Sequence, residues 1–249
     1  MSIVRRLVFC GVIAFSAIPS VVANEPLVLR YEPYPPFVWG EEGRVEGMFA
    51  AHTKKIASTA GFKLLWRKGT YRRIMRDLYD NEGQFCVTGY SRSENSAHLV
   101  QYSEPYGYFP PRGIAVHREN IAMFKYHRHI YDILADPTIR GAFIDGAKYG
   151  EEFNRRVAAG KDRHLRISGE DEDLVRLLAK GRVHFAMVNG AQIQHFKSKI
   201  PDGNELVALY PDGMSKNSEV YIVCTLSTPK ETLAKLNAVI LADGMLHKN

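Results

Sequence analysis

The stretch Tyr34-Pro35-Pro36-Phe37 is followed by Gly43 and Gly47, and a second motif, Tyr102-Ser103-Glu104-Pro105-Tyr106, comes later in the chain. Two aromatic residues around a pair of prolines predict a rigid turn, because each proline ring fixes its backbone φ angle. Such a turn either packs on its own domain or lines a site. The segments on both sides of the two motifs decide what surrounds this turn.

The first half of the chain alternates between strand and helix patterns. Met48, Phe49 and Ile56 form an apolar stripe at helical spacing, and Gly61 ends it. Strand, helix, strand, helix, strand at these lengths predicts a parallel sheet with right-handed crossovers. The expected strands are 27–31, 62–66 and 85–90, and the expected helices are 47–60 and 71–79.

The second half repeats this alternation. Ser168 and Asp171 have the spacing of a capping box at the start of a helix that ends at Gly181. The acidic run 170–173 is either an acidic site or a helix amino terminus, and the helix dipole favours the second interpretation. The other expected elements are strands at 114–116, 142–146, 183–188 and 219–225 and helices at 149–157, 192–200 and 229–241.

The two motifs resemble those of the bacterial extracellular solute-binding proteins of family 3, the periplasmic amino-acid-binding type that serves ABC transporters. In that family an aromatic residue beside Pro-Pro lines the ligand cleft, and Ser-Asp/Glu-Pro-Tyr closes the first lobe. The resemblance implies an α/β fold: a two-lobed clamshell of the type II periplasmic binding proteins, each lobe a mostly parallel sheet flanked by helices. Lobe 1 is then 24–110 with 218–249, and lobe 2 is 111–217. A polar solute would bind between the lobes.

The amino terminus predicts export. Arg5 and Arg6 precede an apolar run that ends at Ile18, and Val21 and Ala23 match a signal-peptidase site, so residues 1–23 are expected to be removed after Ala23. The apolar run is shorter than the roughly 20 residues that span a bilayer. We therefore expect a soluble, monomeric periplasmic protein.

The charge pattern and the histidine spacing give no support for a nucleic-acid-binding protein or a metalloprotein. The formal charge of +6 falls to +4 without the leader, and the basic residues are scattered, so no nucleic-acid partner is expected. His127 and His129 lack a third ligand at metal spacing, so we expect neither a metal nor a cofactor.

In lobe 1 the resemblance assigns ligand contacts to aromatic residues and to the segment after the third strand. Family members sandwich the solute between rings, and an Arg clamps the α-carboxylate; here Ser96 takes that position and Arg92 is the alternative cation. For Tyr34 and Phe37 the alternative is packing on their own lobe, and for Arg92 it is solvation. The lobe 1 candidates are Tyr34, Phe37, Tyr71, Tyr90, Ser91 and Arg92.

In lobe 2 the resemblance places backbone N–H groups at Gly146, beside Tyr149, opposite an anionic group of the solute. The family's strand ending in Asp, which pairs with the ligand's ammonium, ends here in Asn189. With both charged anchors replaced, a standard α-amino acid is a doubtful ligand. An ordinary strand-to-helix turn is the alternative explanation of the Gly146 segment.

Cys86 and Cys224 lie in strands expected in lobe 1, and in the family the returning strand lies beside the third one. An oxidising compartment favours a disulfide when the two Cα atoms lie within about 7 Å. Two buried free thiols are the equal alternative.

The expected function is solute capture for an ABC transporter or a sensor, without catalysis. The first alternative is an accessory or signalling module with the same clamshell. The remote alternative is a cleft enzyme of the dehydratase type, for which the sequence shows no Ser-His-Asp, Cys-His or paired-carboxylate arrangement.

Overall fold

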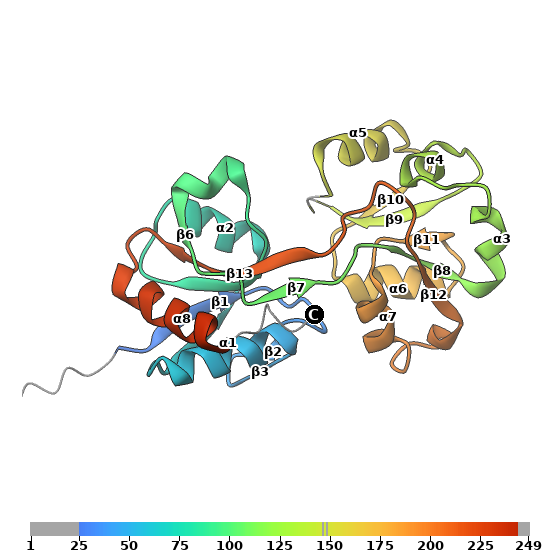
Figure 1. Cartoon of the computed structure of the whole chain (residues 1–249). Coiled ribbons are helices and arrows are strands. Elements are labelled where there is room, and N and C mark those ends of the chain that lie inside the picture. The colour runs from blue at the N-terminus through green and yellow to red at the C-terminus, as the bar shows by residue number, and fades with distance from the viewer. Residues whose placement is uncertain (1–24, 146, 148, 244–249) are drawn as a thin grey trace, which may run out of the picture.

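The computed structural model describes residues 25–145, 147 and 149–243 of the 249-residue chain. The predicted signal peptide, residues 1–23, lies outside the described residues. Two α/β lobes are joined by crossing segments (Figure 1), which confirms the predicted clamshell. We call 25–110 with 218–243 lobe 1 and 111–217 lobe 2.

Lobe 1 is built on a sheet of order β4-β1-β5-β13-β6, with β7 also paired to β13. β1 runs parallel to β4 and β5, whereas the returning β13 is antiparallel to β5, β6 and β7. The strands are β1 Leu27–Tyr31, β4 Leu64–Lys68, β5 Cys86–Tyr90, β6 Val100–Tyr102, β7 Gly107–Phe109 and β13 Ser218–Thr225; the hairpin β2 Trp39–Glu41 with β3 Arg44–Glu46 stands apart. The helices are α1 Met48–Thr59, α2 Tyr71–Tyr79, the short η1 Glu94–Leu99 and α8 Lys230–Asp243.

Alternation along the strands divides lobe 1 into two cores. Ile222 and Cys224 of β13 face the core covered by α1 and α8, whereas Tyr221 and Val223 face the core under α2. This is the period of two that places successive side chains on opposite faces. Burying a large apolar side chain stabilises the fold by about 1.5–3 kcal/mol, so the side chains on both faces of the sheet contribute strongly to the stability of lobe 1.

Lobe 2, like lobe 1, has helices on both faces of a central sheet, whose strand order is β10-β9-β11-β8-β12. Here β9 is parallel to β10 and β11, and β8 is antiparallel to β11 and β12. The elements are β8 Ile114–His117, η2 Arg118–Asn120, α3 Ile121–Phe124, α4 Ile130–Ala135, β9 Gly141–Ile144, α5 Glu151–Ala159, β10 Leu165–Ile167, α6 Asp171–Ala179, β11 Phe185–Ala186, α7 Gly190–Phe196, η3 Gly203–Glu205 and β12 Leu206–Leu209.

The second sequence motif joins the lobe 1 sheet to the hinge. The Ser103 hydroxyl accepts a hydrogen bond from the Ile222 N–H at 3.0 Å, and the Tyr106 N–H donates to the Val220 carbonyl at 2.9 Å. Tyr106 is fully buried, and its hydroxyl accepts from the Gly89 N–H at 3.1 Å. These bonds hold the outgoing β7 beside the returning β13, which run together toward lobe 2 in Figure 1.

Cys86 and Cys224 face each other on β5 and β13 and form a disulfide, with Cα atoms 3.9 Å apart. This resolves the choice between a bond and two thiols. The bond lies between neighbouring antiparallel strands, where directly opposed residues are closest.

Candidate functional site

The Tyr-Pro-Pro-Phe turn is fixed by the start of α1. The Phe37 N–H donates to the Tyr34 carbonyl at 2.9 Å, and the Phe37 carbonyl in turn accepts from the Phe49 N–H at 2.9 Å. These contacts satisfy a free N–H at the helix start. Gly47 has φ of 112°, and a Cβ there would meet the Phe37 carbonyl oxygen at 2.3 Å, so the turn and the helix can approach only through a glycine.

The two aromatic residues of this turn occupy different environments. Phe37 is fully buried and packs against the rings of Phe49 and Phe109, at centroid distances of 5.1 and 5.4 Å. Tyr34 is half-buried, with its ring 5.2 Å from that of Phe37. Phe37 therefore lies in the core of lobe 1, as in the packing alternative, and Tyr34 is the residue of the pair that reaches the cleft.

Tyr71 and Tyr90 extend the aromatic wall. Their rings are stacked, with centroids 6.2 Å apart and planes inclined by 13°. Tyr71 begins α2 and Tyr90 ends β5, so a helix start and the carboxyl end of a strand bring them together. The Glu32 carboxylate, just after β1, accepts from the Tyr71 N–H, and its pKa is raised chiefly by burial and also by Glu170 of lobe 2.

Tyr149 faces this wall from lobe 2. It is half-buried, and its hydroxyl accepts from the Ile144 N–H at 3.2 Å. The Arg112 guanidinium of the hinge lies over the Tyr149 ring, 5.9 Å from its centroid. Burial raises the pKa of Tyr149 to about 12, and the charge of Asp171 adds to this. Gly146, the predicted backbone donor, lies outside the described residues.

Asp171 is the residue that the sequence interpretation missed. It is the first residue of α6 and half-buried, and burial raises the pKa of its carboxyl to about 7. The hydrogen bond from Gln192 and the charge of Arg112 lower this pKa, whereas Glu32 and Glu170 raise it. In lobe 1, the pKa of Tyr34 is raised chiefly by burial and then by the Asp171 charge. Asp171 thus lies near enough to Tyr34 of lobe 1 and Tyr149 of lobe 2 to act on both.

The predicted capping box at this helix was wrong by two residues. The N-cap is Glu170, whose N–H donates to the Asp173 carboxylate at 3.0 Å. Since Ser168 therefore precedes the cap, Asp171 is not the capping acid. The dipole interpretation is confirmed, because Asp171, Glu172 and Asp173 all lie in the first turn of α6.

Asn189 is buried and caps α7 rather than facing a ligand with a free side chain. Its Oδ1 accepts from the Gln192 N–H at 3.0 Å, and Gln192 Oε1 accepts from the Asn189 N–H at 2.9 Å. The Gln192 amide also donates to the Asp171 carboxylate, at 2.5 Å. This network, which we call the Asn189–Gln192–Asp171 chain, joins the starts of α7 and α6. Asn-x-x-Gln is a capping-box pattern, so the sequence held this signal, and α7 begins at Gly190 rather than at the expected residue 192.

The predicted polar contacts of lobe 1 have partners in their own lobe. Arg92 is exposed, pairs with Glu94 at 3.5 Å and lies over the Tyr102 ring at 5.4 Å. The Ser91 hydroxyl is 3.1 Å from that of Ser218 at the hinge. Ser96 is buried and donates to the Tyr79 hydroxyl at 3.3 Å. Ring stacking and electrostatic interactions instead connect Tyr34, Tyr71, Tyr90 and Tyr149 with Glu32, Arg112 and Asp171, and Gln192 is hydrogen-bonded to Asp171.

A direct contact joins the lobes beside this cleft. The ring of Trp39, on β2 of lobe 1, lies 5.3 Å from that of His195 on α7, and Lys199 Nζ lies 5.0 Å from the Trp39 ring. Ala191 also packs against the lobe 1 core. These contacts hold α7 against the β2–β3 hairpin.

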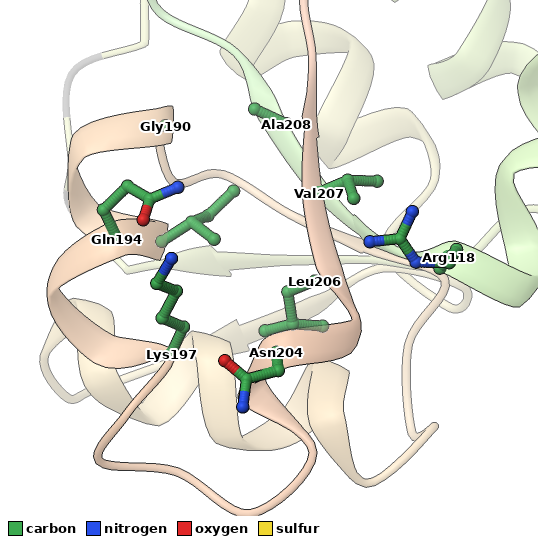
Figure 2. A pocket seen from close by; sticks show the side chains of 9 residues that line it. Arg118, Gly190, Gln194, Lys197, Asn204, Leu206, Val207 and Ala208 are labelled. Carbon is green, nitrogen blue, oxygen red and sulfur yellow. The ribbon is translucent and has the colours of Figure 1, made fainter.

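A separate cavity of about 300 Å³ lies within lobe 2, between α7 and β12 (Figure 2). Gln194 of α7 and Lys197, just after this helix, lie on one side of the cavity, opposite Leu206 and Val207 of β12. The Arg118 side chain at its border pairs with Glu205 at 3.3 Å. Its lining consists of Arg118, Gly190, Ile193, Gln194, Lys197, Asn204, Leu206, Val207 and Ala208. The cavity is therefore distinct from the tyrosine cleft.

The described part of the chain has neither a metal-type cluster of side chains nor a membrane-spanning helix. Within 25–145, 147 and 149–243, no three His, Cys, Asp or Glu side chains gather as they would around a metal ion. In the same described part of the chain, no helix has the length and apolar character needed to cross a bilayer.

Known proteins share this architecture. An ancestral arginine-binding protein bound to arginine superposes with a TM-score of 0.67 at 19% identity, covering 90% of this chain and 95% of that one. A histidine kinase sensor domain with similarity to periplasmic binding proteins gives 0.68 at 17% identity, covering 90% and 96%. A structure from work on glutathione import via GshT and the cystine ABC importer TcyBC of Streptococcus mutans gives 0.67 at 14% identity, covering 90% and 92%.

Sequence comparison identifies the family. No curated protein sequence matches the chain significantly. The sequence profile of the bacterial extracellular solute-binding proteins, family 3, matches residues 27–241, which include every element of both sheets. This match confirms the resemblance drawn from the two motifs, and the chain belongs to family 3 of the bacterial extracellular solute-binding proteins.

Proposed function

We propose that this protein is exported to the periplasm, captures a small polar solute between its lobes and delivers it to a membrane permease or sensor. One observation supports the proposal: the half-buried Tyr34 of lobe 1 interacts electrostatically with Asp171 and Tyr149 of lobe 2, so polar and aromatic groups of both lobes lie near one another. Aromatic faces with a few convergent polar groups are typical of small-molecule sites.

The partner class follows from the family and its structural relatives. One relative is described in work on an ABC importer and another is the sensor domain of a histidine kinase, so both kinds of membrane partner occur with this fold. The predicted leader, residues 1–23, would place the chain in the compartment where such partners collect solutes. The family and the fold are those of binding proteins.

Thermal-shift screening tests solute capture. The purified exported protein would be screened with amino acids, polyamines, organic acids and sugars, because a ligand at one hundred times its Kd stabilises by about 2.7 kcal/mol. A Tyr34→Ala/Tyr71→Ala variant is the control, and its response to the solute should be lost. If no solute of the panel raises the melting temperature, the proposal of small-solute capture is wrong.

Two measurements test the rest of the proposal. Mass spectrometry of the exported protein should find Asn24 as the first residue, and an intact Met1 would contradict export with cleavage. Size-exclusion chromatography with light scattering should give the mass of a monomer.

A further inference from the structure

We infer that the cleft selects an organic cation without a carboxylate, held between Glu32 of lobe 1 and Asp171 of lobe 2 against the tyrosine rings. This inference rests on the proposed function and names the solute class of the same cleft. Amines and guanidinium compounds with an apolar body belong to this class.

The first observation is a pair of like charges across the cleft. Glu32 comes from the segment after β1, and Asp171 from the start of α6, and the charge of Glu32 raises the pKa of Asp171. Two partly buried carboxylates that repel one another are stabilised by a proton or by a cation between them. A solute with a positive charge can supply that cation when the lobes close.

The second observation is the position of the acid relative to the family's usual anchor. The Asn189 amide oxygen is used to cap α7, so it cannot also receive an ammonium without giving up the cap. Gln192, which completes the cap, holds the Asp171 carboxylate with its amide group. The acidic side chain of lobe 2 therefore lies at the start of α6, where Gln192 holds it, and the N-cap of α7, which follows β11, is the neutral Asn189.

The third observation concerns the cations that could bind a carboxylate group of a solute. The family's guanidinium clamp is replaced by Ser96, which is buried and bonded to Tyr79, and Arg92 is paired with Glu94 and Tyr102. The Arg112 charge does reach the cleft, because it lowers the pKa of Tyr34 and Asp171. Among the described residues, two acids, Glu32 and Glu170, and one cation, Arg112, act on the Asp171 carboxyl.

The fourth observation is the aromatic surface. Tyr34, Tyr71, Tyr90 and Tyr149 are all half-buried and come from both lobes. A cation within about 6 Å of a ring centroid is attracted by the ring face, and the attraction is greater in a desolvated site. The rings therefore favour the same sign of charge as the two carboxylates.

Calorimetry with matched ligand pairs tests the inference. Agmatine would be compared with arginine, and cadaverine with lysine, since each pair differs only in the α-carboxylate. In at least one pair the decarboxylated member should bind at least tenfold more tightly. Glu32→Gln and Asp171→Asn should each weaken its binding tenfold or more. Asn keeps an oxygen that can accept from Gln192, so the Asn189–Gln192–Asp171 chain is preserved.

The matched control is Glu172→Gln, the same loss of charge one residue further along α6. Glu172 pairs with Arg176 on its own helix, and its replacement should change the affinity less than threefold. Melting temperatures of all variants would be recorded. Should Asp171→Asn fail to fold, Glu32→Gln and the pH dependence of the unaltered protein decide the question.

The pH dependence gives an independent readout. Asp171 is faced by Gln192 of α7, Glu32 and Tyr34 of lobe 1, Arg112 of the hinge, Tyr149 of lobe 2 and its neighbour Glu170. With its pKa raised to about 7, the carboxyl is protonated in acid and loses its attraction for a cation. The Kd for agmatine should rise by about tenfold for each pH unit below 6, and Asp171→Asn should remove most of this dependence.

The remaining outcomes separate the two proposals. If arginine or lysine binds more tightly than its decarboxylated partner and Arg112→Gln abolishes that preference, Arg112 is a carboxylate clamp and the inference is wrong. If only a neutral or acidic solute of the wider panel binds, the inference is also wrong. Solute capture stands in both cases. If no solute binds, both proposals are wrong.

Discussion

The candidate site residues of lobe 1 are mainly aromatic, whereas those of lobe 2 lie at helix starts joined by polar side chains. Tyr34 packs against the core that contains the stacked Phe37 and Phe49 rings and the Cys86–Cys224 disulfide. Tyr90 packs against the core under α2, and Tyr71 stacks on Tyr90. In lobe 2 the Asn189–Gln192–Asp171 chain depends on hydrogen bonds alone, and this lobe contains no cysteine.

The contrast separates two tasks that one binding site must perform. A covalently tied, ring-packed lobe can hold a fixed surface for a solute's apolar body. The hydrogen-bonded helix starts of the other lobe can adjust as the lobes close, and they carry the titratable charge. We therefore expect changes in lobe 1 to affect stability and shape recognition, and changes in lobe 2 to affect charge selection and acid sensitivity.

Removal of the disulfide should give the largest effect. Cys86 and Cys224 are separated by 138 residues in the chain, and the chain-entropy argument gives about 4–5 kcal/mol for so long a loop. Urea unfolding of Cys86→Ala/Cys224→Ala would measure the loss. Hydrogen exchange should show the largest loss of protection in lobe 1. A loss below about 1 kcal/mol would show that the disulfide does not make lobe 1 more stable than lobe 2.

Phe37→Ala should destabilise the protein by about 3–5 kcal/mol, because it leaves a cavity in a ring-packed core. Tyr126→Ala is the matched control: its ring is 85% exposed, and the change should cost less than about 0.5 kcal/mol. Equal unfolding free energies for the two variants would show that Phe37 is not a core residue.

Tyr34→Ala should act on binding, unlike Phe37→Ala. Truncation of a well-packed aromatic anchor commonly costs about 2 kcal/mol, which is about thirtyfold in affinity. Calorimetry with the solute found by thermal shift would measure it. Arg92→Ala is the control and should change the affinity by less than threefold, because Arg92 is engaged with Glu94 and Tyr102. A loss of binding in Arg92→Ala alone would assign the site to Arg92 instead.

Acid should weaken the protein partly through His164 of lobe 2. This side chain is 4% exposed, its Nδ1 accepts from the Gly141 N–H, and burial, with the charge of Arg163, lowers its pKa to about 4. Since the unfolded state binds the proton more readily between pH 4 and 6.5, the unfolding free energy falls as the pH falls through this window. The expected loss from pH 6.5 to 5 is about 1.5 kcal/mol.

Urea unfolding at both pH values would test this, with His164→Gln as the variant. Gln does not titrate, so the loss of unfolding free energy between pH 6.5 and 5 should be smaller by about 1.5 kcal/mol in this variant. An unchanged slope would show that another group titrates in this range.

Trp39→Ala should have the smallest effect, because Trp39 joins the lobes without belonging to the tyrosine wall. An aromatic pair contributes about 0.5–1.5 kcal/mol beyond area burial, so the solute affinity should fall about fivefold, mainly through faster release. Trp39→Phe keeps a ring for His195 and should stay within twofold. Unchanged release by Trp39→Ala would show that this contact does not hold the lobes closed.

The sequence predicted the elements that local patterns determine. The helix at 71–79 and the strand at 27–31 have the predicted bounds, because an apolar stripe and a β-rich run are local signals. The strand expected at 183–188 pairs only at Phe185 and Ala186. Pairing depends on neighbouring strands, which a single segment does not specify.

For the site, the sequence by itself determined the family through the two motifs and named Tyr34, Tyr71, Tyr90 and Tyr149 as candidate ligand contacts. The tertiary structure alone decided that Phe37 packs inward, that Arg92 contacts Glu94 and Tyr102, and that Asp171 interacts with Tyr34 and Glu32 of the other lobe. The physical reason is that Glu32 and Asp171 lie far apart in the chain and become an interacting pair only when two lobes fold and meet. Local spacing shows which acids can cap a helix, but burial and charge across an interlobe cleft exist only in three dimensions.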